Sequence, residues 1–212
     1  MNDTDCAFDD LLYRSLSLFR QFRLYDDPIE GENAFKLLRE AEKIINDTRD
    51  NICIAKWGCT IECLAHKFYI DGHTDGMLSD VDAFLIKEWK RKKKSFLEKY
   101  IVFLWLGEYF LLRVKNDRSR HQSRNKQMVS KILSFLTDIL RKSDKQEISN
   151  IFSLDVFDET VNWVKEICDM HLFEKQVVAL LERLYALQEE KMIPQRESKE
   201  SSFWRQMWDF YY

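Results

Sequence analysis

Large apolar residues recur at steps of three and four along most of this chain, which is the spacing that places side chains on one face of an α-helix. Phe8, Leu12, Ser15, Phe19 and Phe22 follow this spacing near the start. The 212 residues include only five Gly and two Pro, so residues that form β-turns are scarce. We therefore predict an all-α fold, a single bundle of about nine helices with a C-terminal aromatic helix after it.

The apolar stripes and the turn residues between them locate the predicted helices. We expect a helical domain over residues 1–192, a polar linker over 193–202 and an aromatic tail segment over 203–212. Turns are predicted at Asp26-Asp27-Pro28 with Gly31, and at 71–76, and a mobile polar loop at 116–125. The predicted helices cover about 8–22, 35–45, 52–70, 79–94, 96–114, 128–139, a short piece ending at 152, a helix capped by Ser153, and 173–187.

Charge and composition argue against several classes of function. The formal net charge of −3 provides no overall field for attracting a phosphate backbone, so direct DNA binding is not expected. The most apolar run, 101–112, is shorter than the ~20 residues that span a bilayer, so no membrane segment is expected. The acidic first ten residues do not resemble a targeting leader, and five cysteines fit a reducing compartment.

The last predicted helix carries a seam with the spacing of a coiled coil. Its apolar residues step by four, three, four and three: Phe173, Val177, Leu180, Leu184 and Leu187. Two heptads are too short for a freestanding coiled coil but suit a helix-pair interface. The spacing leaves open whether the seam packs within the chain or forms a partner or dimer interface.

One helix face presents three possible metal ligands. Cys59, Cys63 and His66 follow i, i+4 and i+7 spacing and could hold zinc if a partner supplied a fourth ligand. Packing of the two cysteines in the core is the alternative, because thiols are among the most often buried groups. We expect no catalytic residues, since the four histidines are scattered and no nucleophile motif accompanies them.

The end of the chain is the strongest sign of an interaction surface. Residues 203–212, FWRQMWDFYY, include the candidate interface residues Trp204, Met207, Trp208 and Tyr211. Trp and Tyr dominate the energetically important positions of protein interfaces. We expect a short amphipathic helix in a groove, and the groove could belong to this chain or to a partner.

Several segments resemble the telomere-repeat-factor homology domain. Residues 16–23, LSLFRQFR, followed by 41–45, AEKII, are similar to the first two helices of that family. Phe152-Ser153 with Phe157, Val161 and Val164 are similar to its penultimate helix, and the order of these segments agrees over about residues 8–190.

The resemblance implies a nuclear scaffold of the telomere-capping shelterin complex that dimerises or docks peptides and performs no chemistry. By helix order, the family's dimer surface corresponds to Leu12, Phe19, Leu38, Leu180 and Leu184. The sequence lacks the DNA-reading Myb module and is more similar to bridging subunits, which can share a zinc ion with a partner. The alternatives are a helical adaptor of an unrelated intracellular complex and a metal-binding helical enzyme.

Overall fold

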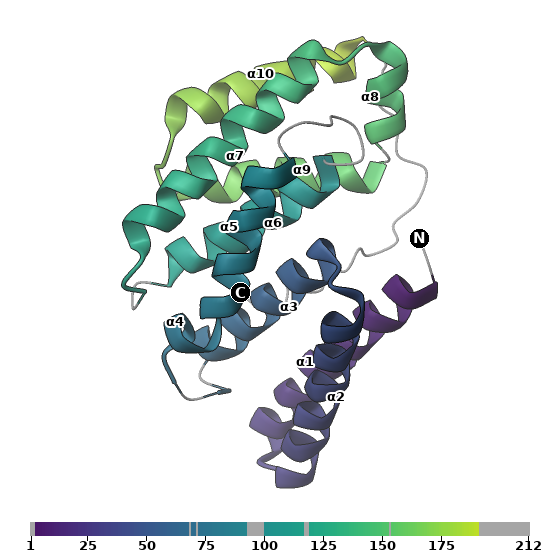
Figure 1. Ribbon diagram of the computed structural model, residues 1–212, viewed down its shortest axis with the longest axis vertical. Helices are drawn as coiled ribbons and strands as arrows, with labels where there is room; N and C mark the ends of the chain where they lie inside the picture. The colour runs from purple at the N-terminus through teal and green to yellow at the C-terminus, as the bar shows by residue number, and fades with distance from the viewer. Residues whose placement is uncertain are drawn as a thin grey trace. The chain divides into compact units, whose positions relative to one another are not determined.

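The computed structural model describes residues 3–67, 69–70, 72–92, 100–116, 119–152 and 154–190. These residues form ten α-helices and contain no β-strand, which confirms the all-α prediction (Figure 1). The helices are α1 Asp3–Tyr25, α2 Pro28–Thr48, α3 Asn51–His66, α4 Thr74–Met77, α5 Ser79–Lys92, α6 Tyr100–Lys115, α7 Gln122–Lys142, α8 Lys145–Ile151, α9 Leu154–Asp169 and α10 Glu174–Glu189.

The chain divides into two compact units. Within the described residues, the first unit contains α1 to α4 and the start of α5, up to Leu85. The second unit begins at Ile86 and contains the rest of α5 and α6 to α10. No turn or linker marks this boundary in the sequence, because it falls inside a helix, and we therefore describe each unit separately.

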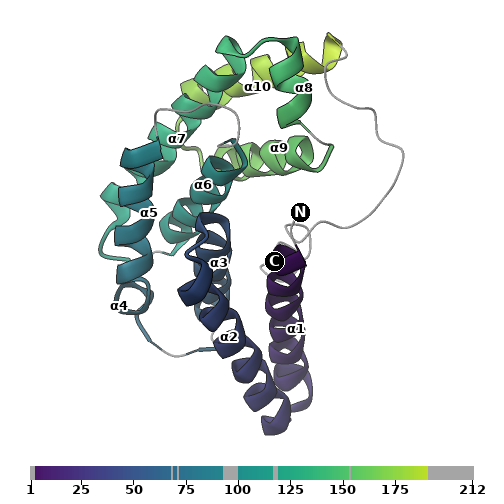
Figure 2. The same ribbon diagram turned by 45° about the vertical axis from the view of Figure 1, so that its right-hand side comes forward.

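An antiparallel pair of helices, α1 and α2, is the main packing contact of the first unit (Figure 2). The apolar stripe of α1 is buried, as predicted, and the facing side of α2 carries small residues that let the two backbones come close. The Ser15 hydroxyl on α1 donates a hydrogen bond of 3.0 Å to the Ala34 carbonyl on α2. The predicted hairpin of the first two helices is thus confirmed.

The turn between α1 and α2 is shorter than predicted. Asp26 has a positive φ of 54°, and the Asp27 carboxylate caps α2 by accepting a hydrogen bond of 3.0 Å from the Ile29 amide. Pro28 begins α2, where its missing N–H is not needed. Contrary to the prediction, Gly31 is not part of the turn but is buried in the first turns of α2. A Cβ at this position would lie 3.3 Å from the Phe22 ring.

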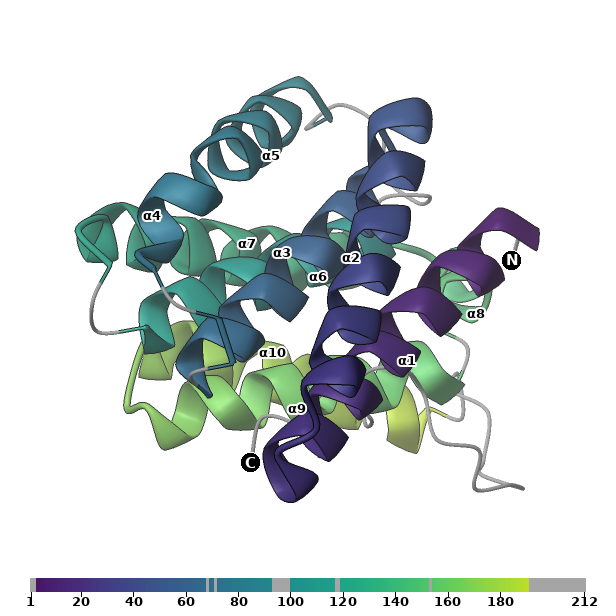
Figure 3. The same ribbon diagram turned by 90° about the horizontal axis from the view of Figure 1, so that it is seen from below.

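The third helix, α3, is buried on nearly every side, as its apolar composition predicted. Asp50 caps it by accepting hydrogen bonds from the Ile52 and Cys53 amides at 2.8 and 2.9 Å. The helix ends at His66, four residues earlier than predicted. Part of the predicted turn after it is the short helix α4, which leads directly into α5 (Figure 3).

The second unit is built around α6, whose residues are nearly all buried and which packs against α7 and α9. Trp163 of α9 lies over Gly107 of α6, where a Cβ would come within 2.5 Å of the Trp163 ring. Trp89, Phe103 and Phe135 join α5, α6 and α7 through edge-to-face ring contacts with centroids 4.8–5.4 Å apart. Helix α10 lies alongside α7 (Figures 1 and 2).

Two further predictions about this unit need correction. The predicted loop at 116–125 ends by residue 121, because α7 begins at Gln122, whose side-chain amide donates to the Asn116 carbonyl. Phe173 does not belong to the last helix but precedes it with a positive φ of 55°. The short helix before residue 152 is confirmed as α8, which begins with a capping box formed by Asp144 and Glu147.

Candidate functional site

The predicted seam of the last helix lies inside the second unit. Val177, Leu180, Leu184 and Leu187 are 0–2% exposed, and α10 packs against α7 and α9 of the same chain. Two side-chain hydrogen bonds hold α10 to α7: Arg183 Nε donates to the Leu140 carbonyl at 2.9 Å, and Gln176 donates to Ser130 at 3.2 Å. An interface with another chain through this seam would require these helices to separate.

The other predicted dimer residues are also core residues. Leu12 and Phe19 are fully buried and Leu38 nearly so, within the α1–α2 pair of the first unit. The tail residues Trp204, Met207, Trp208 and Tyr211, and the predicted cap Ser153, lie outside the described residues. Each of the predicted interface positions that the structure describes on α1, α2 and α10 therefore stabilises the chain itself.

The apolar side chains that remain exposed form a different set. Among the described residues, most of the large ones belong to the first unit, and five lie on α1 and α2: Tyr13, Leu24, Tyr25, Ile29 and Phe35. Leu24, Tyr25 and Ile29 flank the turn at 26–27 and are 67%, 76% and 66% exposed. We call these three residues the hairpin tip. The sequence holds a signal for them, because Leu24 and Tyr25 fall after the last residue of the buried stripe of α1.

The predicted zinc ligands do not share one environment. Cys59 and Cys63 are fully buried in α3, whereas His66 is exposed at the end of this helix. Among the described residues, no group of three or more His, Cys, Asp or Glu side chains is arranged to hold a metal ion. The burial of the two cysteines matches the alternative of core packing, and zinc binding stays a prediction.

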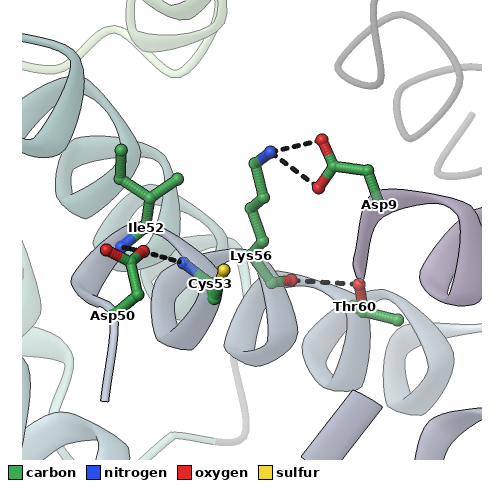
Figure 4. A network of polar contacts seen from close by, with 6 residues as sticks. All are labelled: Asp9, Asp50, Ile52, Cys53, Lys56 and Thr60. Carbon is green, nitrogen blue, oxygen red and sulfur yellow. Dashed lines mark hydrogen bonds and ion pairs between the residues drawn. The ribbon is translucent and has the colours of Figure 1, made fainter. Parts of the chain in front are cut away.

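A buried ion pair connects α1 and α3 in the first unit (Figure 4). Lys56 Nζ lies 2.7 and 2.6 Å from the two carboxylate oxygens of Asp9, and the two side chains are 11% and 20% exposed. One turn further along α3, the Thr60 hydroxyl donates to the Lys56 carbonyl at 3.0 Å. Because the ammonium group is held in a two-pronged contact, we interpret this pair as a structural link and not as a reactive lysine.

The second unit buries a carboxyl group between α6 and α9. Glu108 is 1% exposed, and its Oε2 has no hydrogen-bond partner within the part of the chain that the structure describes. Burial raises the pKa of Glu108 well above its usual range; nearby Lys115 opposes the shift, and Glu166 and Glu159 add to it. Lys115 forms an ion pair with Glu166. A neutral Glu108 is thereby favoured, and we assign it no chemical role because its side chain is buried in the α6–α9 packing.

Another buried polar contact joins the same two helices. The Tyr100 hydroxyl and the Thr160 hydroxyl lie 3.3 Å apart, and burial raises the pKa of Tyr100 above its ordinary value. The Thr160 hydroxyl also donates to the Val156 carbonyl at 2.7 Å. These groups satisfy polar atoms of the α6–α9 packing, and we assign them no chemical role.

Comparison with protein-family models, curated proteins and solved structures gives no significant match to this chain. The resemblance to the telomere-repeat-factor homology domain is therefore neither supported nor contradicted by these comparisons. No helix among the described residues is long and apolar enough to cross a membrane.

Proposed function

We propose that this chain is a non-enzymatic, helical protein-interaction module. The observation that carries this proposal is the group of large apolar side chains left exposed on α1 and α2. Single exposed apolar residues are common, but several on one helical hairpin mark a surface that gains free energy when another polypeptide covers it. Tyrosine, which is present twice in this group, is enriched at the energetically important positions of protein interfaces.

The more specific form of the proposal is a bridging adaptor of a telomere-capping complex in the nucleus. Its support is the resemblance of residues 16–23, 41–45 and 152–164 to the telomere-repeat-factor homology domain. A helical adaptor or scaffold of an unrelated intracellular complex is the second candidate, and it uses the same exposed surface.

Proximity labelling in cells, with the full chain fused to a biotin ligase, tests both forms. The expected result is enrichment of a small set of proteins that includes telomere components. Enrichment of a defined complex without telomere components would contradict the telomeric form and favour the second candidate. Labelling no different from that of the free ligase would contradict the interaction module itself.

A further inference from the structure

The hairpin tip is held in a fixed conformation. The turn between its two helices has only two residues, and the amides of Glu30 and Gly31 both donate to the Asp27 carbonyl, at 3.2 and 3.4 Å. The Asp27 side chain fixes the start of α2, and α1 and α2 pack closely below the turn. The turn joins the lower ends of α1 and α2 in Figures 1 and 2. A surface that is already ordered loses little conformational entropy when it binds.

Acidic residues alternate with the hairpin-tip residues along the sequence. Residues 24–32, LYDDPIEGE, contain four carboxylates, Asp26, Asp27, Glu30 and Glu32, and no Lys or Arg. We call these four the acidic collar. The nearest basic residue before this stretch in the sequence, Arg23, is engaged elsewhere: its guanidinium donates to the Lys67 carbonyl at 2.6 Å and lies over the Tyr69 ring.

On the basis of the function proposed above, we infer that the hairpin tip docks into an apolar pocket of a protein partner whose rim carries Lys and Arg. Burial of Leu24, Tyr25 and Ile29 supplies the hydrophobic part of the binding, and the acidic collar selects a basic rim. A second copy of this tip would bring two acidic collars together, which opposes association. Nucleic acids and anionic lipid surfaces carry the same charge sign as the collar and are disfavoured for the same reason.

A random peptide library displayed on phage and selected against the full chain provides a defined probe. We expect the selected peptides to combine large apolar residues with flanking Lys or Arg. The variant Leu24→Ser/Tyr25→Ser/Ile29→Ser should bind a synthetic copy of such a peptide at least about tenfold more weakly, the effect of losing central interface residues. All three positions are exposed, so the variant should keep the melting temperature of the wild type.

Two further variants separate the charge from the apolar contact and from non-specific effects. Asp26→Asn/Glu30→Gln/Glu32→Gln removes three charges but keeps Asp27, which caps α2, and should weaken binding several-fold and reduce its salt dependence. The control is Val178→Ser/Tyr185→Ser on α10, which removes apolar residues of similar exposure in the other unit and should leave binding unchanged.

Selected peptides without basic residues, or peptides that bind the tip variant as tightly as the wild type, would overturn the inference. Peptides that bind elsewhere on the chain would overturn the inference about the tip but would still support the proposed function as an interaction module. Self-association seen by light scattering and abolished in the tip variant would identify a second copy as the occupant and would also overturn it. Binding to vesicles of phosphatidylserine through the tip would have the same consequence.

Discussion

Replacing Gly107 by alanine tests the closest helix contact in the second unit. A Cβ at Gly107 would lie 2.5, 2.9 and 3.0 Å from three carbon atoms of the Trp163 ring. Carbon atoms in contact are normally about 3.5–4.0 Å apart, so the methyl group would overlap the ring by roughly 1 Å. Trp163 is fully buried, so the ring cannot turn outward into solvent. Helices α6 and α9 must therefore move apart.

The expected cost follows from two opposing effects. Overpacking a core costs about 1–3 kcal/mol, and the size of this overlap places Gly107→Ala near the upper end. Alanine in a helix interior recovers about 1 kcal/mol relative to glycine. We expect a net loss of about 2 kcal/mol in the free energy of unfolding. For a chain of this size, that corresponds to a melting temperature lower by about 4–8 °C.

Thermal melts followed by circular dichroism, with urea unfolding as a second measurement, provide the assay. Gly31→Ala is the matched control, because its Cβ would meet only the half-buried Phe22 ring at 3.3 Å. It should be neutral or slightly stabilising. Adding Trp163→Phe to Gly107→Ala should cost less than the sum of the two single changes, since a smaller ring leaves room for the methyl group. A Gly107→Ala variant as stable as the wild type would refute the close contact.

Three other changes test buried groups. Glu108→Gln should raise the melting temperature at pH 8 but have little effect near pH 4. Burial raises the pKa of Glu108, so the wild-type chain loses stability as pH rises through that raised value, and the variant does not. An equal effect at both pH values would contradict this reasoning. Asp9→Ala should lower the free energy of unfolding in urea by up to about 3 kcal/mol, because it leaves the Lys56 ammonium buried without this carboxylate. A change below about 0.5 kcal/mol would show that the ion pair contributes little to stability. Leu180→Glu puts a charge at a fully buried position, so thermal melts should show a loss of several kcal/mol, and normal stability would contradict the packing of α10 on α7.

The sequence predicted helices well because burial imposes a period that the apolar residues must follow. The seam residues Leu180 and Leu184 were recognisable for this reason, and the structure buries both. Glycines were harder to interpret, because the same residue type can break a helix or admit a close neighbour. Gly31 was predicted to lie in the turn between two helices, and it instead lies within α2 against Phe22. Only the position of the facing helix distinguishes these two roles.

The hairpin tip was missed for a related reason. A helical period in the apolar residues identifies side chains that are buried together, and it does not identify an apolar residue that lies outside the buried stripe. Leu24, Tyr25 and Ile29 flank a turn that the sequence predicted. Their exposure could not be predicted, because it depends on where α2 starts and how closely it packs on α1. Secondary structure can be read from the spacing, whereas exposure requires the tertiary arrangement.

The same limit explains why the seam could not reveal its own partner. A stripe of Val177, Leu180 and Leu184 gains the same free energy of burial whether it meets α7 of its own chain or a helix of another. Once α7 and α9 cover it, α10 has only its outer face to offer, where Val178 and Tyr185 are exposed with the exposed Glu182 between them. Residues at i, i+4 and i+7 share a helix face, so this second stripe carries a charge at its centre. A homodimer through α10 would have to bury that charge, which makes this face a poor interface between two copies of the chain.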